Sequence, residues 1–220
     1  LKLQNMKIYT DLHSRTNFFN IPKWGREEIE SFGAELIHDY DESVTIYFGD
    51  LLEKKDVMSL PNLKWIHFPS VGVNRALIPE VINSDIIVTN SKGLFNKSVT
   101  SMVISYITYF CKGFHYIEKL RNENNLNRKS FDEFLPFVKE PFFSGLKCLI
   151  VGHGSIGNEL SDICSYLGIK VDSVRSKDNI KESIKESQAD FVVNLLPLTP
   201  KTDSVFDYET FECMKSDSYF

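Results

Sequence analysis

KCLIVGHGSIG, residues 147–157, joins a short apolar run to three glycines spaced as G-x-G-x-x-G. The apolar run predicts a buried strand, and the glycines follow it directly, ahead of a stretch of helical character. In such a turn Gly152 permits the tight bend, Gly154 lets a pyrophosphate approach the backbone, and Gly157 allows the helix to pack closely on the sheet. The pattern predicts a dinucleotide-binding turn. The alternative is an ordinary glycine-rich turn between a strand and a helix.

The predicted helix after this turn is amphipathic. Its first residues, Ser155 and Ile156, have backbone N–H groups that are free to donate to a phosphate at the positive end of the helix. Its apolar residues fall on one face before Gly168: Ile156, Leu160, Ile163, Cys164 and Leu167.

Two further strands are predicted beyond this helix, Lys170–Val174 and Phe191–Leu196, with a short charged helix at Ile180–Gln188 between them. Two strand–helix units followed by a third strand fit the first half of a doubly wound, Rossmann-type domain.

The end of the second of these strands decides which dinucleotide is expected. A carboxylate about 20 residues after the glycines would accept hydrogen bonds from the ribose of NAD. Here the strand ends in Val174 and is followed by Arg175, Ser176 and Lys177, which offer charge-assisted hydrogen bonds to the extra phosphate of NADP. Asp172 points away if the strand alternates regularly. NADP(H) is therefore favoured over NAD(H); the alternative is a solvated basic turn.

The N-terminal third alternates short strands with helical segments, which favours a parallel sheet covered on both faces. The predicted strands are Met6–Thr10, Glu35–His38, Val44–Phe48, Leu63–Phe68 and Asp85–Thr89, and the predicted helices are Lys23–Phe32 and Leu51–Leu60.

One long helix is predicted over Ser98–Leu120, because apolar residues recur there at three- and four-residue steps. It would join two domains, residues 1–97 and 98–220, and its apolar surface suits a homodimer. Arg121–Lys139 is predicted to be a wrapping loop.

Composition excludes several classes of protein. The 220 residues carry a formal net charge of −5 and no basic block, which argues against nucleic acid or an anionic membrane as a partner. The N-terminus lacks the apolar core of a signal peptide and no apolar run is long enough to span a bilayer, so a cytoplasmic protein is expected. The four cysteines lie far apart, which predicts reduced core thiols and no metal site: Cys111, Cys148, Cys164 and Cys213.

Residues 189–202, ADFVVNLLPLTPKT, together with Gly145–Lys147 ahead of the glycine turn, resemble the D-isomer-specific 2-hydroxyacid dehydrogenase family. The resemblance is to members such as glyoxylate/hydroxypyruvate reductases and phosphoglycerate dehydrogenases. It extends to residues 60–66, 70–74, 87–90 and 211–215, so it covers nearly the whole chain. It implies a flavodoxin-like substrate domain over residues 1–97 and the first part of a Rossmann dinucleotide-binding domain over residues 98–220.

The resemblance also implies roles for particular residues. The backbone N–H groups of Ser70, Val71 and Gly72 would hold the carboxylate of a small 2-oxo or 2-hydroxy acid; the alternative is a plain turn between a strand and a helix. Three residues at or beyond the end of the last predicted strand would lie beside the dinucleotide: Leu196, Pro197 and Thr202. The implied reaction is hydride transfer between the nicotinamide and the 2-carbon of the acid.

The sequence departs from the family where the chemistry is expected. Family members continue into an Asn-x-x-Arg-Gly segment whose arginine binds substrate, and later supply the Glu and His of the acid/base pair. None of these residues is present in the sequence. A further departure, Thr100-Ser101 in place of the usual Ala-Glu pair, is expected to alter packing more than chemistry. The five histidines do not take the catalytic position, and we interpret them as structural, surface or turn residues: His13, His38, His67, His115 and His153.

This departure leaves two readings of the function. No catalytic residue is assigned, and we expect a truncated dehydrogenase whose Leu146–Val151 strand is left as an unpaired apolar edge. The alternative is a non-catalytic nucleotide-binding or regulatory protein that keeps the fold.

Overall fold

The computed structural model describes residues 6–12, 20–125, 127, 138 and 142–220, and His13 lies outside them. The chain divides into two compact units, Leu1–Leu94 and Phe95–Phe220. The division falls between Leu94 and Phe95. The boundary predicted from the sequence, between residues 97 and 98, lies three residues further along the chain.

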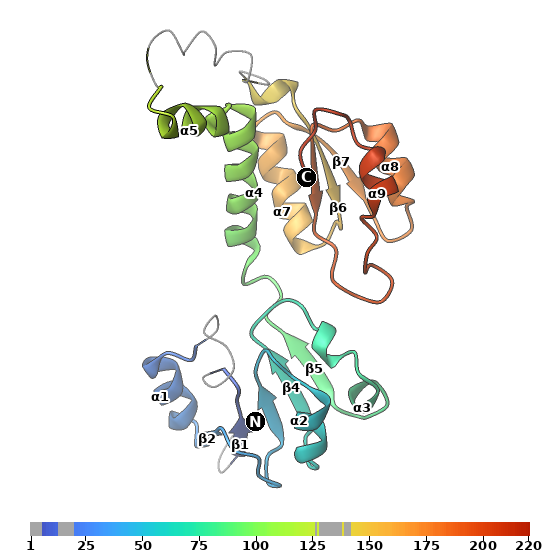
Figure 1. Ribbon diagram of the computed structural model, residues 1–220. Coiled ribbons are helices and arrows are strands. Elements are labelled where there is room, and N and C mark those ends of the chain that lie inside the picture. Colours follow the sequence, from blue (N-terminus) through green and yellow to red (C-terminus); the bar gives the residue numbers. More distant parts are fainter. Residues whose placement is uncertain (1–5, 13–19, 126, 128–137, 139–141) are drawn as a thin grey trace. The chain divides into compact units, whose positions relative to one another are not determined.

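The first unit is a five-stranded parallel sheet in the order β2-β1-β3-β4-β5 (Figure 1). This is the flavodoxin-like strand order. Its strands are β1 (Met6–Tyr9), β2 (Ala34–Ile37), β3 (Ile46–Phe48), β4 (Trp65–Phe68) and β5 (Ile87–Asn90). Its helices are α1 (Lys23–Ser31), α2 (Lys54–Ser59), the 3₁₀ turn η1 (Asn74–Ala76) and α3 (Pro79–Ile82). All five strands were predicted, with ends that match or are displaced by one or two residues.

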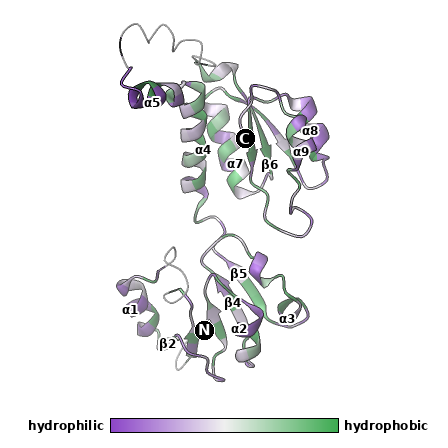
Figure 2. Ribbon diagram, viewed as in Figure 1, coloured by the Kyte–Doolittle hydropathy of each residue, from purple (hydrophilic) through white to green (hydrophobic). Residues whose placement is uncertain are grey.

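Alternation along these strands sends apolar side chains to both faces of the sheet. On one face Tyr47 and Ile66 pack with residues of α2 and α3. On the other face Ile8 and Ile46 pack against α1 through Ile29. Figure 2 shows the resulting hydrophobic strands and the more hydrophilic outer surface of α1. Because all the strands are parallel, the loops after β1, β3, β4 and β5 share one edge of the sheet.

The second unit holds a three-stranded parallel sheet in the order β7-β6-β8. Its strands are β6 (Lys147–Val151), β7 (Lys170–Val174) and β8 (Phe191–Asn194). Its helices are α4 (Asn96–Cys111), α5 (Phe114–Asn122), η3 (Phe143–Gly145), α7 (Ser155–Tyr166), α8 (Ile180–Ser187) and α9 (Tyr208–Glu212). Side chains of α4 and α7 pack on one face, through Ile107 and Leu160, and α8 packs on the other through Ile184 (Figure 1).

The prediction that the Leu146–Val151 strand would be an unpaired edge was wrong. β6 is the central strand, and Cys148 lies opposite Val171 of β7 on one side and Phe191 of β8 on the other. The crossover through α8 carries the chain past β6, so β8 pairs with the side of β6 that was expected to be unpaired. In the part of the chain that the structure describes, the outer side of β8 makes one isolated bridge, between Phe191 and Tyr219.

The prediction of one helix over Ser98–Leu120 was also wrong, because α4 and α5 are separate helices. Gly113 lies between them with a φ of 67°, in the left-handed region that a residue without a side chain adopts at little cost. The apolar spacing continues on both sides of this break and so concealed it. Arg121 and Asn122, assigned to the loop 121–139, belong to α5; most of that loop lies outside the described residues.

Substituting Gly113→Ala should lower the free energy of unfolding by about 1–2 kcal/mol, because a side chain disfavours the left-handed conformation. Gly25→Ala is the matched control. Gly25 lies within α1, where an added Cβ would meet its nearest neighbours at 3.6 Å, so this change should stabilise by about 0.5–1 kcal/mol. Urea unfolding followed by circular dichroism measures both, and stabilisation by both variants would contradict the assigned break.

Candidate functional site

The glycine turn between β6 and α7 gives each glycine a different surrounding. Gly152 has a φ of 100°, and a Cβ added there would lie 2.7 Å from the carbonyl carbon of Leu195. A Cβ on Gly157 would lie 2.9 Å from the carbonyl oxygen of Gly152 and 3.3 Å from Cγ2 of Ile150. A Cβ on Gly154 would have no atom within 4 Å. Close packing therefore requires glycine at positions 152 and 157, whereas Gly154 borders open space.

The first turn of α7 faces this open space with unused hydrogen-bond donors. Gly154 is the N-cap and supplies no side-chain cap, and the Asn158 N–H donates to the Gly154 carbonyl at 2.9 Å. Among the described residues, the N–H groups of Ser155, Ile156 and Gly157 have no acceptor. Free N–H groups at the positive end of a helix fit a phosphate.

The loop that leaves β8 lies against the glycine turn. The Leu195 N–H donates to the carbonyl of Val151 at 2.7 Å, and the backbone of Leu196 passes Gly152 closely. Thr202 shapes this loop from within, because its hydroxyl donates to the carbonyl of Pro197 and accepts the Thr199 N–H at 2.9 Å. The structure thus brings Leu196 beside the glycine turn, while the hydroxyl of Thr202 is engaged in holding the loop.

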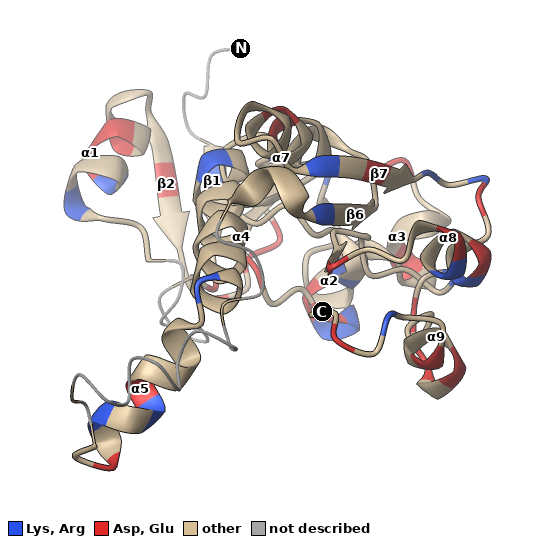
Figure 3. Ribbon diagram, turned by 90° about the horizontal axis from the view of Figure 1, so that it is seen from above, with Lys and Arg blue, Asp and Glu red and all other residues tan. Residues whose placement is uncertain are grey.

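The turn after β7 is exposed and mostly basic, as Figure 3 shows between β7 and α8. Arg175, Ser176 and Lys177 are all exposed. Sequence reasoning overlooked Asp178, whose carboxylate accepts the Arg175 N–H at 2.7 Å and so lies in the same turn. Its spacing from the glycines, about 20 residues, was the available signal.

Asp172 lies at the middle of β7 and pairs with Lys147, with 2.8 Å between its Oδ2 and the lysine Nζ. Burial opposes ionisation of this carboxyl, yet the neighbouring Lys147 ammonium holds the pKa of Asp172 below its ordinary value. The Asp172 carboxylate is therefore paired with Lys147 within the sheet, away from the basic turn.

In the first unit, the Ser70–Gly72 loop follows β4 at the carboxyl edge of the sheet. The Ser91 N–H donates to the carbonyl of Ser70 at 3.2 Å, and the Asn90 side-chain amide donates to the carbonyl of Val71 at 2.6 Å. Within the described part of the chain, the N–H groups of Val71 and Gly72 meet no acceptor. Two neighbouring free N–H groups are suited to an anion.

The four histidines within the described residues lie apart from these donors or lack an orienting partner. Nδ1 of His38 lies 2.9 Å from the carbonyl oxygen of Thr10, and Nδ1 of His67 lies 2.8 Å from the hydroxyl of Thr89. Burial lowers the pKa of His67. Nδ1 of His115 and of His153 is buried without a partner. No group of potential metal ligands occurs among the described residues, and the four cysteines are free, with Cys213 only half-buried.

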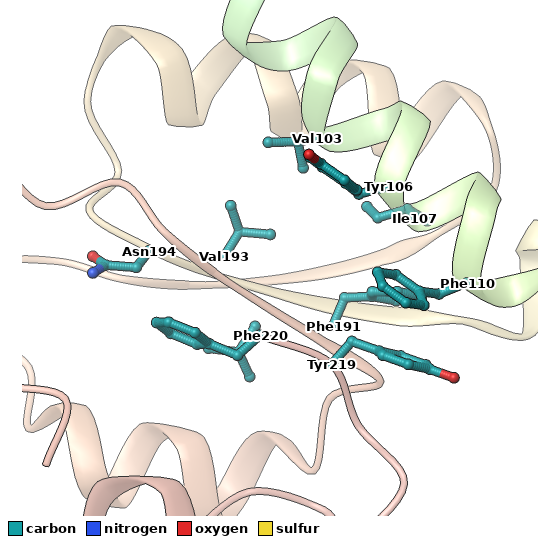
Figure 4. A pocket seen from close by; sticks show the side chains of 10 residues that line it. Val103, Tyr106, Ile107, Phe110, Phe191, Val193, Asn194, Tyr219 and Phe220 are labelled. Carbon is teal, nitrogen blue, oxygen red and sulfur yellow. The ribbon is translucent and has the colours of Figure 1, made fainter. Parts of the chain in front are cut away.

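A cavity of about 550 Å³ lies between α4 and the outer side of β8 (Figure 4). Its lining is almost wholly apolar and includes Val103, Tyr106, Phe110, Val193 and Phe220. Asn194 supplies the one side-chain amide. A charged nucleotide or a carboxylate would lose its hydration here without gaining partners, so this cavity is a poor candidate for either ligand.

The strand, the glycine turn and the uncapped helix of the second unit have the geometry of a dinucleotide-binding Rossmann-type domain. Comparison with protein families gives the same class: the model described as D-isomer specific 2-hydroxyacid dehydrogenase, NAD binding domain, matches residues 105–220. The match covers more than half of the chain, and the chain belongs to this family of NAD(P)-dependent oxidoreductases. It has no significant match among curated protein sequences.

Solved structures share the fold at low sequence identity. A D-lactate dehydrogenase of Aquifex aeolicus, complexed with NAD and lactic acid, has a TM-score of 0.74 at 18% identity. A D-isomer specific 2-hydroxyacid dehydrogenase of Xanthobacter autotrophicus, complexed with NADPH and MES, has 0.73 at 15%. An NAD-dependent formate dehydrogenase of Staphylococcus aureus, complexed with NAD, has 0.76 at 18%.

These comparisons cover 94%, 96% and 97% of this chain, respectively, and 66%, 69% and 72% of the three matched chains. This chain thus spans about two thirds of the length of such structures. In the described ranges, no helix has the length and apolar character needed to cross a membrane.

Gly154→Ala should weaken NADPH binding at least tenfold while leaving the free energy of unfolding within about 0.5 kcal/mol, because its methyl group would enter only the open space in front of α7. Gly157→Ala should instead destabilise by about 1–3 kcal/mol, because its Cβ meets the backbone of Gly152. Nucleotide fluorescence titration and urea unfolding of both variants separate the effects. Equal effects of the two changes on stability would refute this assignment.

Proposed function

We propose that this chain binds a nicotinamide dinucleotide at the β6–α7 turn and serves hydride transfer to or from a small 2-oxo or 2-hydroxy acid. The observation that carries the proposal is the set of free N–H groups on Ser155, Ile156 and Gly157 beside the open space at Gly154. These groups fit the pyrophosphate, and membership of the family supplies the class of reaction.

The nicotinamide, when bound, supplies the hydride chemistry, and the residues of this chain bind and orient. Gly154 leaves room for the pyrophosphate, while Gly152 and Gly157 allow the close packing that shapes the turn. Leu196 and Pro197 line the side of the dinucleotide, and Thr202 keeps their loop against the glycine turn through its bond to the Pro197 carbonyl. The Ser70–Gly72 loop holds the carboxylate of the acid through the N–H groups of Val71 and Gly72. Proton transfer is not assigned to any described residue.

We further propose that NADP(H) is preferred over NAD(H). Arg175 and Ser176 are exposed at the carboxyl end of β7, where they can donate to a 2′-phosphate. Asp178 opposes this preference electrostatically, but its Oδ2 already accepts the Arg175 N–H. The turn carries two positive charges, on Arg175 and Lys177, and one negative charge, on Asp178, so its net positive charge favours binding of the phosphate.

We also propose a homodimer that works in the cytoplasm. Met102 and Tyr106 of α4 are each 59% exposed and lie one turn apart on the helix, forming an apolar surface that a second copy would cover. The free cysteines suit a reducing compartment.

The cofactor assignment is tested by titrating the chain with NADPH and NADH at fixed ionic strength, following nicotinamide fluorescence. NADPH should bind more tightly, and Arg175→Ala should narrow the difference by about three- to tenfold, through loss of a charge-assisted bond. Lys170→Ala is the matched control, because Lys170 is exposed at the opposite end of the same strand and should leave both affinities unchanged.

Tighter binding of NADH would overturn the preference alone. Binding of neither nucleotide would overturn the proposed function. Binding without turnover of any 2-oxo acid would instead favour a non-catalytic nucleotide-binding role.

A further inference from the structure

The carboxyl end of β5 controls the direction of two peptide groups in the Ser70–Gly72 loop. Asn90, the last residue of β5, lies opposite Phe68 in the parallel ladder, and its Nδ2 donates to the carbonyl of Val71 at 2.6 Å. The next residue, Ser91, donates its N–H to the carbonyl of Ser70 at 3.2 Å. The carbonyl groups of Ser70 and Val71 are therefore turned toward the end of β5.

This orientation fixes where the following N–H groups point. In a trans peptide the carbonyl of one residue and the N–H of the next point in opposite directions. Because the Ser70 carbonyl points toward β5, the Val71 N–H points away from β5. The Gly72 N–H also points away from β5, because the Val71 carbonyl points toward it. Neither N–H has an acceptor within the described ranges, and Gly72 is exposed. Two donors are therefore directed to the same side of the loop.

The end of β5 is itself held firmly against β4. Trp65 Nε1 donates to the hydroxyl of Thr89 at 2.7 Å, and that hydroxyl also lies 2.8 Å from Nδ1 of His67. The Ser91 hydroxyl donates to the carbonyl of Phe68 at 3.3 Å. Asn90 therefore approaches the loop from a fixed platform, so its amide can impose an orientation on Val71.

We propose that Asn90 is a positioning residue, whose side-chain amide holds the Val71 peptide so that the Gly72 N–H, beside that of Val71, is presented to the carboxylate of a 2-oxo acid. The inference rests on the proposed function of the Ser70–Gly72 loop. Its chemical requirement is a neutral donor at position 90. A carboxylate there has no proton to donate to the Val71 carbonyl and would repel the bound anion. An alanine would leave the half-buried Val71 peptide free to turn.

The test uses the full 220-residue chain labelled with ¹⁵N, with pyruvate as the probe. Addition of pyruvate should shift the amide proton signals of Val71 and Gly72, and the shifts should saturate and yield a Kd. Asn90→Ala and Asn90→Asp should each raise that Kd at least tenfold, with Asn90→Asp the weaker binder.

Asn62→Asp is the matched control. The Asn62 side-chain amide also donates to a backbone carbonyl, that of Glu42 at 2.8 Å, but from the turn before β4 at the other end of the sheet. This variant should bind pyruvate as the unmodified chain does. The thermal midpoints of the Asn90 variants should match that of Asn62→Asp, so that a loss of affinity reports the orientation of the loop and not its stability.

The outcomes separate the inference from the function on which it rests. If pyruvate shifts Val71 and Gly72 in the unmodified chain and equally in the Asn90 variants, the positioning role is wrong and the anion site stands. If pyruvate leaves both amides of the unmodified chain unchanged, the proposed substrate loop fails, and the role of Asn90 fails with it.

Discussion

The backbone of Leu195 and Leu196 passes so close to Gly152 that a Cβ there would lie 2.7–2.8 Å from three of its atoms. This contact joins the loop that leaves β8 to the turn that leaves β6. Because β6 is the central strand, its carboxyl end fixes the position of both loops. The first turn of α7 then follows with its N–H groups uncovered, since Gly157 lets the helix rest against the turn.

Both candidate sites use main-chain N–H groups as their principal donors. At the α7 N-terminus the donors belong to Ser155, Ile156 and Gly157, and in the first unit they belong to Val71 and Gly72. A main-chain donor depends on the path of the backbone and only weakly on the side chain that it carries. The comparison with the D-lactate dehydrogenase, with a TM-score of 0.74 at 18% identity, shows that this backbone path can be kept while most side chains change.

Local patterns in the sequence predicted the elements well and their placement less well. The strand Lys170–Val174 was predicted with the bounds that the structure gives, because Gly168 before it and the polar residues from Arg175 onward mark its two ends in the local sequence. The pairing of β8 with β6 was missed, because no local pattern states on which side of β6 a crossover returns. The break at Gly113 was missed because the apolar spacing runs through it. Asn90 could not be found from sequence, because its partner Val71 is 19 residues away and the bond depends on the register of β4 with β5.

The most direct test of the account is hydrogen–deuterium exchange of the chain with and without NADPH. We expect slowed exchange at the amides of Ser155, Ile156 and Gly157, which have no acceptor in the described protein and would gain one in the pyrophosphate. Peptides from α1, in the other unit, should exchange at an unchanged rate. Unchanged exchange at the start of α7 under saturating NADPH would contradict the central claim that this turn is where the dinucleotide binds.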